Sequence, residues 1–543
     1  MTNKEIADQI QELGSLMELH GENEFKTRTY SSAYLQIKKQ DLALDQLSLS
    51  EIQHQTGLGK SIAEKIVELS QTGKISVLEK YRALTPSGVR EMFKIKGVGP
   101  KKVKIFWQEM GLETVGELLY ACKENRLIAF KGFGPKIQED IQTNIEYLYS
   151  QNGYFLLAKI RPLALEILNE LRSLNPSLHI ELTGDIRRLM PIIRQIEFLS
   201  DGPLKLWPER LQITEKSDDS FSGFVEDHIG FIIFFCDLKE FGNQWLQTTS
   251  GSSQFAKLFD LPLPQATHEE DLFSVVQQAF IPPECRDLTD FSKLNTALLV
   301  QPKDIKGVIH THSTWSDGLY DIRSIAMECI RLGYQYLVIT DHSKSAVYAN
   351  GLSIERVEMQ WREIDAINKE LEDFHIYKGI ESDILSDGCL DYPNDILSGF
   401  DLVIASIHSN LKMDEDKAMI RLIKAIENPF TRILGHLTGR LLLARKGYPV
   451  DHIKLIDCCA ANHVAIELNA NPVRLDIGWE WLPYAQDKGV LIAINPDAHN
   501  LKGITDIQFG IEAARKGGLN TSNCLNCMDQ EAFKCWQNVK KAD

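Results

Sequence analysis

The second half of the chain alternates between short apolar runs and segments with the apolar spacing of amphipathic helices. The seven apolar runs begin at Gly307, Tyr336, His375, Leu402, Arg432, Val464 and Leu491. The helix-like segments between them cover residues 322–332, 354–371, 416–427, 450–462 and 480–488. Strands that alternate with helices are typical of a parallel sheet covered by helices. The pattern therefore predicts a parallel β/α barrel of seven strands.

Most of these apolar runs end in a residue that can bind a metal ion. The first run contains His310 and His312, and Asp317 follows five residues later. Because side chains alternate along a strand, we expect the two imidazoles to point the same way. The later runs end in His342, Glu381, His408, His436, Asp497 and His499. Strand ends meet on one face of a barrel, and unpaired buried polar groups are costly, so the sequence predicts a polynuclear metal site there.

A short glycine-containing pattern occurs three times in the first 150 residues. Each copy lies between two apolar helical stretches and has a lysine shortly after the second glycine. The copies contain Gly57, Gly59 and Lys60; Gly97, Gly99 and Lys101; and Gly132, Gly134 and Lys136. Glycines allow the backbone to approach a ligand, and the free N–H groups at a helix start suit a phosphate. Three copies with matching lysines favour binding to a nucleic-acid backbone without sequence readout.

Composition places this chain among ordinary globular proteins. It has 543 residues and a net charge of −16, with 43% hydrophobic and 25% charged residues. The first 150 residues hold 20 basic and 20 acidic residues, so the whole acidic excess follows them. No run of 18 apolar residues predicts a membrane span. Ten scattered cysteines favour reduced thiols and a cytoplasmic protein, and we interpret Cys524-x-x-Cys527 as a surface turn rather than a zinc site.

The glycine pattern resembles the helix-hairpin-helix motif of DNA repair proteins, and residues 1–150 resemble the N-terminal region of family X DNA polymerases. Lys65 falls where some members carry a Schiff-base lysine that removes a 5′-deoxyribose phosphate. A desolvated lysine can be such a nucleophile, although a solvated helix lysine is the more common case.

Residues 151–300 resemble the nucleotidyltransferase palm of the same polymerases, with altered carboxylates. Asp185 stands where the family has serine, and Gln195 and Glu197 stand where it has an Asp-x-Asp pair. Phosphoryl transfer requires clustered carboxylates around metal ions, so these changes predict an impaired polymerase site. The alternative is an unusual working site, with Mg²⁺ held by Glu197 and Asp237.

Residues 301–543 resemble the PHP (polymerase and histidinol phosphatase) domain, and the whole chain resembles a bacterial family X DNA polymerase fused to it. The resemblance implies about three ions, Zn²⁺ or Mn²⁺. His310, His312, Glu381 and Asp497 would hold the first; Glu381, His408 and His436 the second; Asp317, His342 and His499 the third. It also implies catalytic roles for Glu381, His408 and Asp497, while Lys344 and Arg440 are candidates to bind substrate phosphates.

The function predicted is DNA repair, within base excision repair, by a metal-dependent 3′→5′ exonuclease that also processes abasic sites or 3′ phosphates. The expected partner is gapped, recessed or abasic DNA, and the expected state is a monomer. Three alternatives remain open: a gap-filling polymerase with proofreading, a small-molecule phosphatase of the histidinol-phosphatase type, and a non-catalytic DNA scaffold. We expect four domains. They are an N-terminal helical domain (1–85), a second hairpin region (86–150), a degenerate palm (151–300) and the barrel (301–543).

Overall fold

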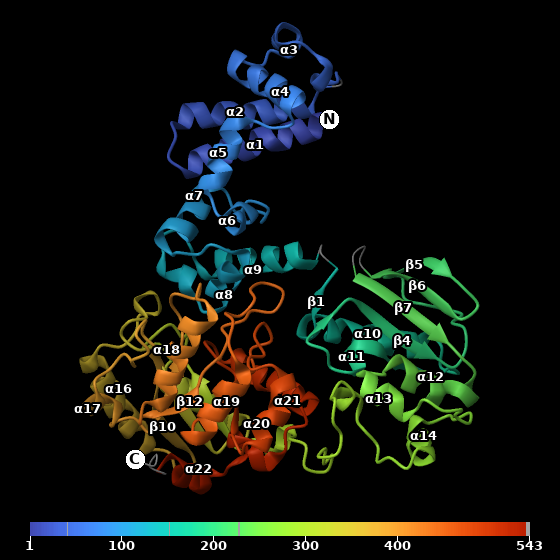
Figure 1. Cartoon of the computed structure of the whole chain (residues 1–543), viewed down its shortest axis with the longest axis vertical. Coiled ribbons are helices and arrows are strands. Elements are labelled where there is room, and N and C mark those ends of the chain that lie inside the picture. Colours follow the sequence, from blue (N-terminus) through green and yellow to red (C-terminus); the bar gives the residue numbers. More distant parts are fainter. Residues whose placement is uncertain (41, 151–152, 226–228, 539–543) are drawn as a thin grey trace. The chain divides into compact units, whose positions relative to one another are not determined.

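The computed structural model describes residues 1–40, 42–150, 153–225 and 229–538, which form two compact units (Figure 1). The hairpin unit contains residues 1–122 and 132–148. The barrel unit contains residues 123–131 and 149–543, so the palm and the barrel pack as one body. Among the described residues, no helix is both long and apolar enough to cross a bilayer.

The hairpin unit is entirely helical. Its helices are α1 (Asn3–Leu19), α2 (Glu24–Lys38), α3 (Leu49–Thr56), α4 (Lys60–Thr72), α5 (Ser76–Leu84), α6 (Ser87–Met92), α7 (Pro100–Lys104), α8 (Val115–Lys123) and α9 (Pro135–Ser150). A capping box of Thr2 and Glu5 starts α1. Gly14 allows α1 and α2 to pack closely, because a Cβ there would lie 2.7 Å from the Cβ of Tyr30.

The palm forms the first part of the barrel unit. Its elements are β1 (Phe155–Leu156), α10 (Leu157–Leu174), β2 (Ile180–Leu182), α11 (Gly184–Arg187), β3 (Ile192–Ile193), β4 (Gln195–Ser200), β5 (Leu211–Lys216), β6 (Ser220–Val225), β7 (Ile229–Phe235), α12 (Phe241–Thr248), α13 (Ser253–Leu258) and α14 (Glu269–Val275). Five strands pair in the order β2-β4-β7-β6-β5, and only β4 and β7 run parallel. The expected α+β palm is therefore present.

Seven parallel strands form the barrel, as the sequence predicts. They are β8 (Gly307–Thr311), β9 (Tyr336–Ile339), β10 (His375–Asp383), β11 (Leu402–Ser406), β12 (Thr431–Leu434), β13 (Ala465–Asn469) and β14 (Ile492–Asn495), in sequential order. Between and after them lie α15 (Ile322–Arg331), α16 (Ile354–Asn368), α17 (Asn394–Leu397), α18 (Glu415–Glu427), α19 (His452–Ala461), α20 (Leu482–Asp487), α21 (Ile507–Lys516) and α22 (Gln530–Gln537). The ring closes where the His312 N–H donates to the Ala498 carbonyl at 2.9 Å.

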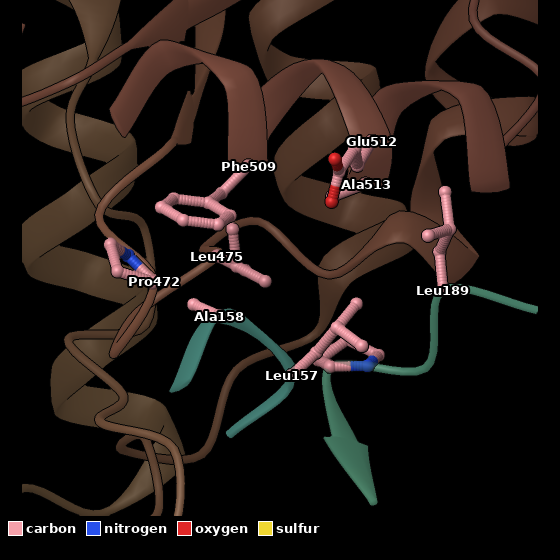
Figure 2. A pocket seen from close by; sticks show the side chains of 9 residues that line it. Leu157, Ala158, Leu189, Pro472, Leu475, Phe509, Glu512 and Ala513 are labelled. Atoms are coloured by element: carbon pink, nitrogen blue, oxygen red, sulfur yellow. The ribbon is translucent and has the colours of Figure 1, made fainter. Parts of the chain in front are cut away.

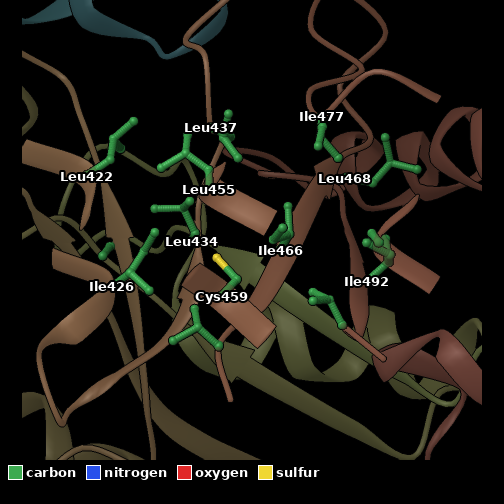
Figure 3. Packing of buried hydrophobic residues seen from close by; sticks show 14 of the residues in the cluster. Leu422, Ile426, Leu434, Leu437, Leu455, Cys459, Ile466, Leu468, Ile477 and Ile492 are labelled. Atoms are coloured by element: carbon green, nitrogen blue, oxygen red, sulfur yellow. The ribbon is translucent and has the colours of Figure 1, made fainter. Parts of the chain in front are cut away.

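Aliphatic side chains fill the space between the strands and the surrounding helices (Figure 3). Leu434, Ile466 and Ile492 stand in register on three successive strands, and all are fully buried. At the amino end of the strands, Phe533 of α22 stacks on Tyr336 at 4.5 Å between ring centroids. Cys524 is buried under this end, so the expectation that it lies at a surface turn is wrong.

Charged pairs and a small apolar pocket join the palm to the barrel. The buried Lys516 ammonium of α21 donates to Asp287 and to the Arg188 carbonyl, and Arg515 pairs with Glu284. Figure 2 shows Leu157 and Leu189 of the palm facing barrel residues across the pocket. These contacts explain why the two regions pack as one body.

Candidate metal centre

Side chains from distant parts of the barrel sequence converge at the carboxyl ends of the strands. Three overlapping groups place their ligand atoms within 4.8 Å of one another, so each could hold a divalent metal ion. The groups are His312, Asp317, His342 and His499; His310, His312 and Asp497; and His342, Glu381 and His408. Together with His436, they include every metal ligand expected from the sequence.

Glu381 lies at the middle of this cluster, near the end of β10. One oxygen, Oε1, lies 3.0 Å from His436 Nε2, 3.2 Å from His408 Nε2 and 3.3 Å from His310 Nε2. The other oxygen, Oε2, lies 2.9 Å from His342 Nδ1. A carboxylate that contacts four imidazoles through both oxygens has the geometry of a bridging ligand.

The cluster is almost fully buried, and its polar atoms are not satisfied by the protein. His310, His342, Glu381 and His436 are each at most 1% exposed. Within the described residues, their atoms His310 Nε2, His342 Nε2, Glu381 Oε2 and His436 Nδ1 accept or donate no hydrogen bond. Buried groups left in this state are rare and costly unless an ion completes them. The residues present therefore fit a divalent metal centre.

Neighbouring groups shift the pKa values of the cluster histidines in opposite directions. Burial opposes protonation of His408, but Glu381 and Asp383 raise its pKa to about 9. Burial, with His499 and His342 close by, lowers the pKa of His312 to about 3. Metal ligands must be deprotonated, so protons compete with metal ions at some of these positions.

The backbone places the first two histidines differently from a regular strand. His310 has a φ of 66°, in the left-handed region, and the register between β8 and β9 shifts after Val308. A regular alternation is therefore the wrong explanation for their common direction. An irregular strand end brings both rings to the cluster, with centroids 5.3 Å apart.

Two buried carboxylates outside the expected ligand set hold histidines in place. Glu467 accepts from His310 Nδ1 at 2.6 Å, and Asp383 accepts from His408 Nδ1 at 2.5 Å. Such partners fix the tautomer that leaves Nε2 available for a metal. Glu467 lies on β13, and only the fold shows what it contacts.

A third buried carboxylate shapes the loop that carries Asp317. Asp341 accepts hydrogen bonds from the backbone N–H and hydroxyl of Ser313, from Ser316 and from Gln360. Burial raises the pKa of the Asp341 carboxyl, while these donors favour its charged form. Asp341 precedes the ligand His342 and thus connects two parts of the cluster.

The three glycine hairpins share one geometry in the hairpin unit. The first glycine of each, Gly57, Gly97 and Gly132, has a φ between 71° and 96° and needs to be glycine for that reason. The second glycine of each does not. Gly59, Gly99 and Gly134 have no positive φ, and an added Cβ would meet no atom within 4 Å. Their following helices begin at Lys60, Pro100 and Pro135, and the expected lysines are exposed.

Known proteins and protein families match both the hairpin region and the chain as a whole. Residues 1–75 match the model of a helix-hairpin-helix domain, and residues 89–142 match that of a SAM-like helix-hairpin-helix tandem. The "DNA polymerase/3′-5′ exonuclease PolX" of Bacillus subtilis (strain 168) is 33% identical over 98% of this chain and 99% of its own length. The chain belongs to the PolX family.

Other relatives of this PolX family member match its barrel alone. A probable phosphatase of Thermoanaerobacter sp. (strain X514) is 28% identical over 40% of this chain and 88% of its own length. A probable phosphatase of Caldanaerobacter subterraneus subsp. tengcongensis is 30% identical over 35% of this chain and 74% of its own length.

Three arginines of the palm in this PolX chain have partners within the fold. Arg187 and Arg286 both donate to the fully buried Glu269, and Arg187 also lies over Trp245, 3.5 Å from the ring centroid. Arg188 donates to Asp185 and to Asp287. These contacts leave the arginines after Gly184 committed to internal partners.

Glu197 and Asp237 are not paired neighbours in the palm sheet. Glu197 pairs in register with Ile232 of β7, and Asp237 lies five residues further along that chain. Asp237 lies beyond the end of β7 at Phe235, so it is not the strand neighbour of Glu197. None of the candidate metal groups among the described residues includes a palm residue.

The residues predicted to bind substrate phosphates or to act as a lyase nucleophile also have contacts within the protein. Arg440 donates to the carbonyls of Arg474 and Leu475, and the exposed Lys344 lies 5.7 Å from the ring centroid of Tyr392. Lys65 is half-buried and donates to the carbonyl and hydroxyl of Ser61. A lysine hydrogen-bonded at a partly solvated helix surface lacks the desolvation that activates a Schiff-base nucleophile.

Proposed function

We propose that this chain is a divalent-metal-dependent 3′→5′ exonuclease that acts on DNA ends during repair. The observation that carries the proposal is the convergence of nine ligand-type residues, Glu381 among them, on a chain that also carries three glycine hairpins. The Bacillus subtilis relative is named for a polymerase and a 3′-5′ exonuclease activity, and it aligns with nearly the whole chain.

The barrel residues supply a binding site for ions and a phosphate ester. His310, His312, Glu381 and Asp497 are proposed to hold one ion, with Glu381 shared with the ion held by His408 and His436. Asp317, His342 and His499 are proposed to hold the third. Mixed imidazole and carboxylate ligands suit Zn²⁺ or Mn²⁺. When bound, such ions activate water as a nucleophile and offset the negative charge of a phosphodiester.

The hairpins are proposed to hold the DNA backbone. The second glycine of each hairpin is not required by the fold, since its φ is ordinary and its surroundings are open. A residue without a side chain at such a place is explained by the close approach of another molecule. The N–H groups that start α4 and α9, together with Lys60, Lys101 and Lys136, suit phosphates.

Polymerase activity is proposed to be impaired. Gln195 cannot act as a charged ligand, Asp237 is not the strand neighbour of Glu197, and the arginines after Gly184 pair with internal carboxylates. Lyase activity at Lys65 is not favoured by its partial exposure. Borohydride treatment with abasic DNA should therefore trap no adduct on this lysine, and processing of abasic sites would then depend on the barrel.

A second candidate is hydrolysis of a small phosphomonoester, because the barrel-only relatives are named as probable phosphatases. Removal of a 3′ phosphate from DNA uses the same chemistry. The hairpins favour DNA over a free metabolite as the carrier of that phosphate.

The test is a metal-dependence series with Mn²⁺, Zn²⁺ and Mg²⁺ on end-labelled recessed, gapped, abasic and 3′-phosphorylated duplexes, alongside histidinol phosphate. We expect stepwise shortening from the 3′ end. Glu381→Ala and His408→Ala should abolish it while the melting temperature of the metal-free protein changes little. His463→Asn is a matched control, because His463 is exposed and lies outside the cluster. Undiminished cleavage by both cluster variants would contradict the proposal, and a preference for histidinol phosphate would favour the second candidate.

A further inference from the structure

A nine-residue segment, Lys123–Lys131, leaves the hairpin unit and packs in the barrel unit, although the chain on both sides of it belongs to the hairpin unit. Two of its side chains contact residues of the metal centre or residues beside it. The Asn125 side chain donates to the backbone carbonyl of Asp317 at 3.5 Å. The Arg126 guanidinium lies 4.0 Å from the ring centroid of Tyr348, and that ring lies next to His342.

Glu124 in this segment is a buried carboxylate with an unusual environment. Its side chain is 3% exposed, and among the described residues neither of its oxygens accepts a hydrogen bond. Arg474 forms an ion pair with this carboxyl, since its Nη2 lies 3.7 Å from Glu124 Oε1. Arg474 is itself buried, and its Nε lies 3.9 Å from Oδ2 of the cluster residue Asp497. Burial raises the pKa of the Glu124 carboxyl, whereas His499, Arg474 and Arg126 favour its charged form. The side chain is thus kept beside the cluster by nearby positive charge, without the hydrogen bonds that normally offset burial.

In the proposed reaction, the phosphate group of the substrate would have to lie beside Arg474, where the Glu124 carboxyl now lies. A phosphate ester hydrolysed at the cluster must bring its negative oxygens beside the ligands, and an arginine is well suited to bind them. Arg474 is a buried guanidinium next to a proposed ligand. His310 is 0%, Glu381 1% and His499 5% exposed, so a DNA strand can reach them only if a covering part moves.

We propose that Arg474 binds the substrate phosphate and that Glu124 occupies this phosphate position in the free protein. The inference rests on the proposed nuclease function. The carboxylate stands in for a phosphate, and the Lys123–Lys131 segment must withdraw before the substrate can enter. Because both ends of the segment continue into the hairpin unit, DNA bound by the hairpins can pull on it through the chain.

The test uses the full-length, Mn²⁺-loaded protein and two probes that do not need the hairpins. Inorganic phosphate binding is measured by calorimetry, and hydrolysis of bis(4-nitrophenyl) phosphate is measured by absorbance. Glu124→Gln keeps the shape of the side chain and removes its charge. If the phosphate position is open in one molecule in ten, emptying it should tighten phosphate binding and raise kcat/KM about tenfold. Arg474→Gln should weaken phosphate binding by a similar factor.

Glu139→Gln is the matched control, because Glu139 is an exposed carboxylate of α9, and it should change neither quantity. Metal content and melting temperature are measured for every variant. If Glu124→Gln binds phosphate no more tightly, or loses hydrolysis at unchanged metal content, the inference is overturned. If no variant hydrolyses the ester but Glu124→Gln still binds phosphate more tightly, the nuclease proposal fails and the phosphate position stands.

Discussion

Glu467→Gln tests whether the buried partner of a histidine controls the metal centre. In the structure each oxygen of Glu467 accepts two hydrogen bonds. Oε2 accepts from His310 Nδ1 at 2.6 Å and from Asn495 at 2.8 Å, and Oε1 accepts from the His436 N–H at 3.1 Å and from Asn469 at 3.0 Å. A glutamine has only one oxygen, so its amide NH₂ must face two of these donors.

Both orientations of the glutamine have a cost. If the NH₂ faces the His436 N–H and Asn469, two buried donors lose their acceptor, at about 1–3 kcal/mol each. If it faces His310, the imidazole can accept only by moving its proton to Nε2, the atom that points at Glu381. A metal ion must then displace that proton. Loss of such an outer partner typically weakens metal binding about 10–100-fold, and we expect a decrease in that range.

The assay is a Mn²⁺ titration by calorimetry, with unfolding followed in urea on the metal-free protein. Glu269→Gln is the control, because Glu269 is an equally buried glutamate in the palm and should lower stability without changing metal affinity. Asp383→Asn, at His408, should weaken binding in the same way as Glu467→Gln. Wild-type Mn²⁺ affinity in Glu467→Gln would show that the reasoning about the His310 tautomer is wrong.

Three further predictions concern the rest of the chain. Glu269→Gln should lower the free energy of unfolding by about 3–5 kcal/mol, because Arg187 and Arg286 lose their shared buried partner. Burial alone would raise the pKa of Glu269, but the two arginines lower it, so its stabilisation is present above the unfolded pKa and is lost as pH falls through the folded one. Urea unfolding at pH 7 and pH 4 should therefore show a smaller difference between wild type and variant at the lower pH. Gly99→Ala should leave the melting temperature unchanged and weaken binding to labelled duplex DNA. Gly97→Ala, at φ 79°, should lower the free energy of unfolding by about 1–2 kcal/mol. If the two variants changed stability and DNA binding to the same extent, the proposal that the second glycine contacts DNA would be contradicted. The wild-type chain should not extend a primer on gapped DNA with Mg²⁺ or Mn²⁺, and template-dependent extension would refute the account of the palm.

The palm shows the limit of reading carboxylates from a sequence. The replacement of an Asp-x-Asp pair by Gln195 and Glu197 is visible in the sequence, and it predicts impaired metal binding there. Whether Asp237 could replace the missing carboxylate depends on the register of β4 and β7. That register pairs Glu197 with Ile232, five residues before Asp237. Pairing between strands 35 residues apart is set by packing of the whole sheet, not by local pattern.

The sequence by itself determined the barrel and the hairpins, and it predicted the candidate metal ligands that the structure brings together. Short apolar runs and the 3.6-residue spacing of apolar positions set strands and helices locally, and parallel strands bring their carboxyl ends to one face whatever the details of packing. Tertiary structure decided which buried carboxylates support which histidines, because Glu467 and His310 are 157 residues apart and meet only when the ring closes. It also decided that Glu124 lies beside Arg474, since nothing in a local pattern of charges shows where a connecting segment packs.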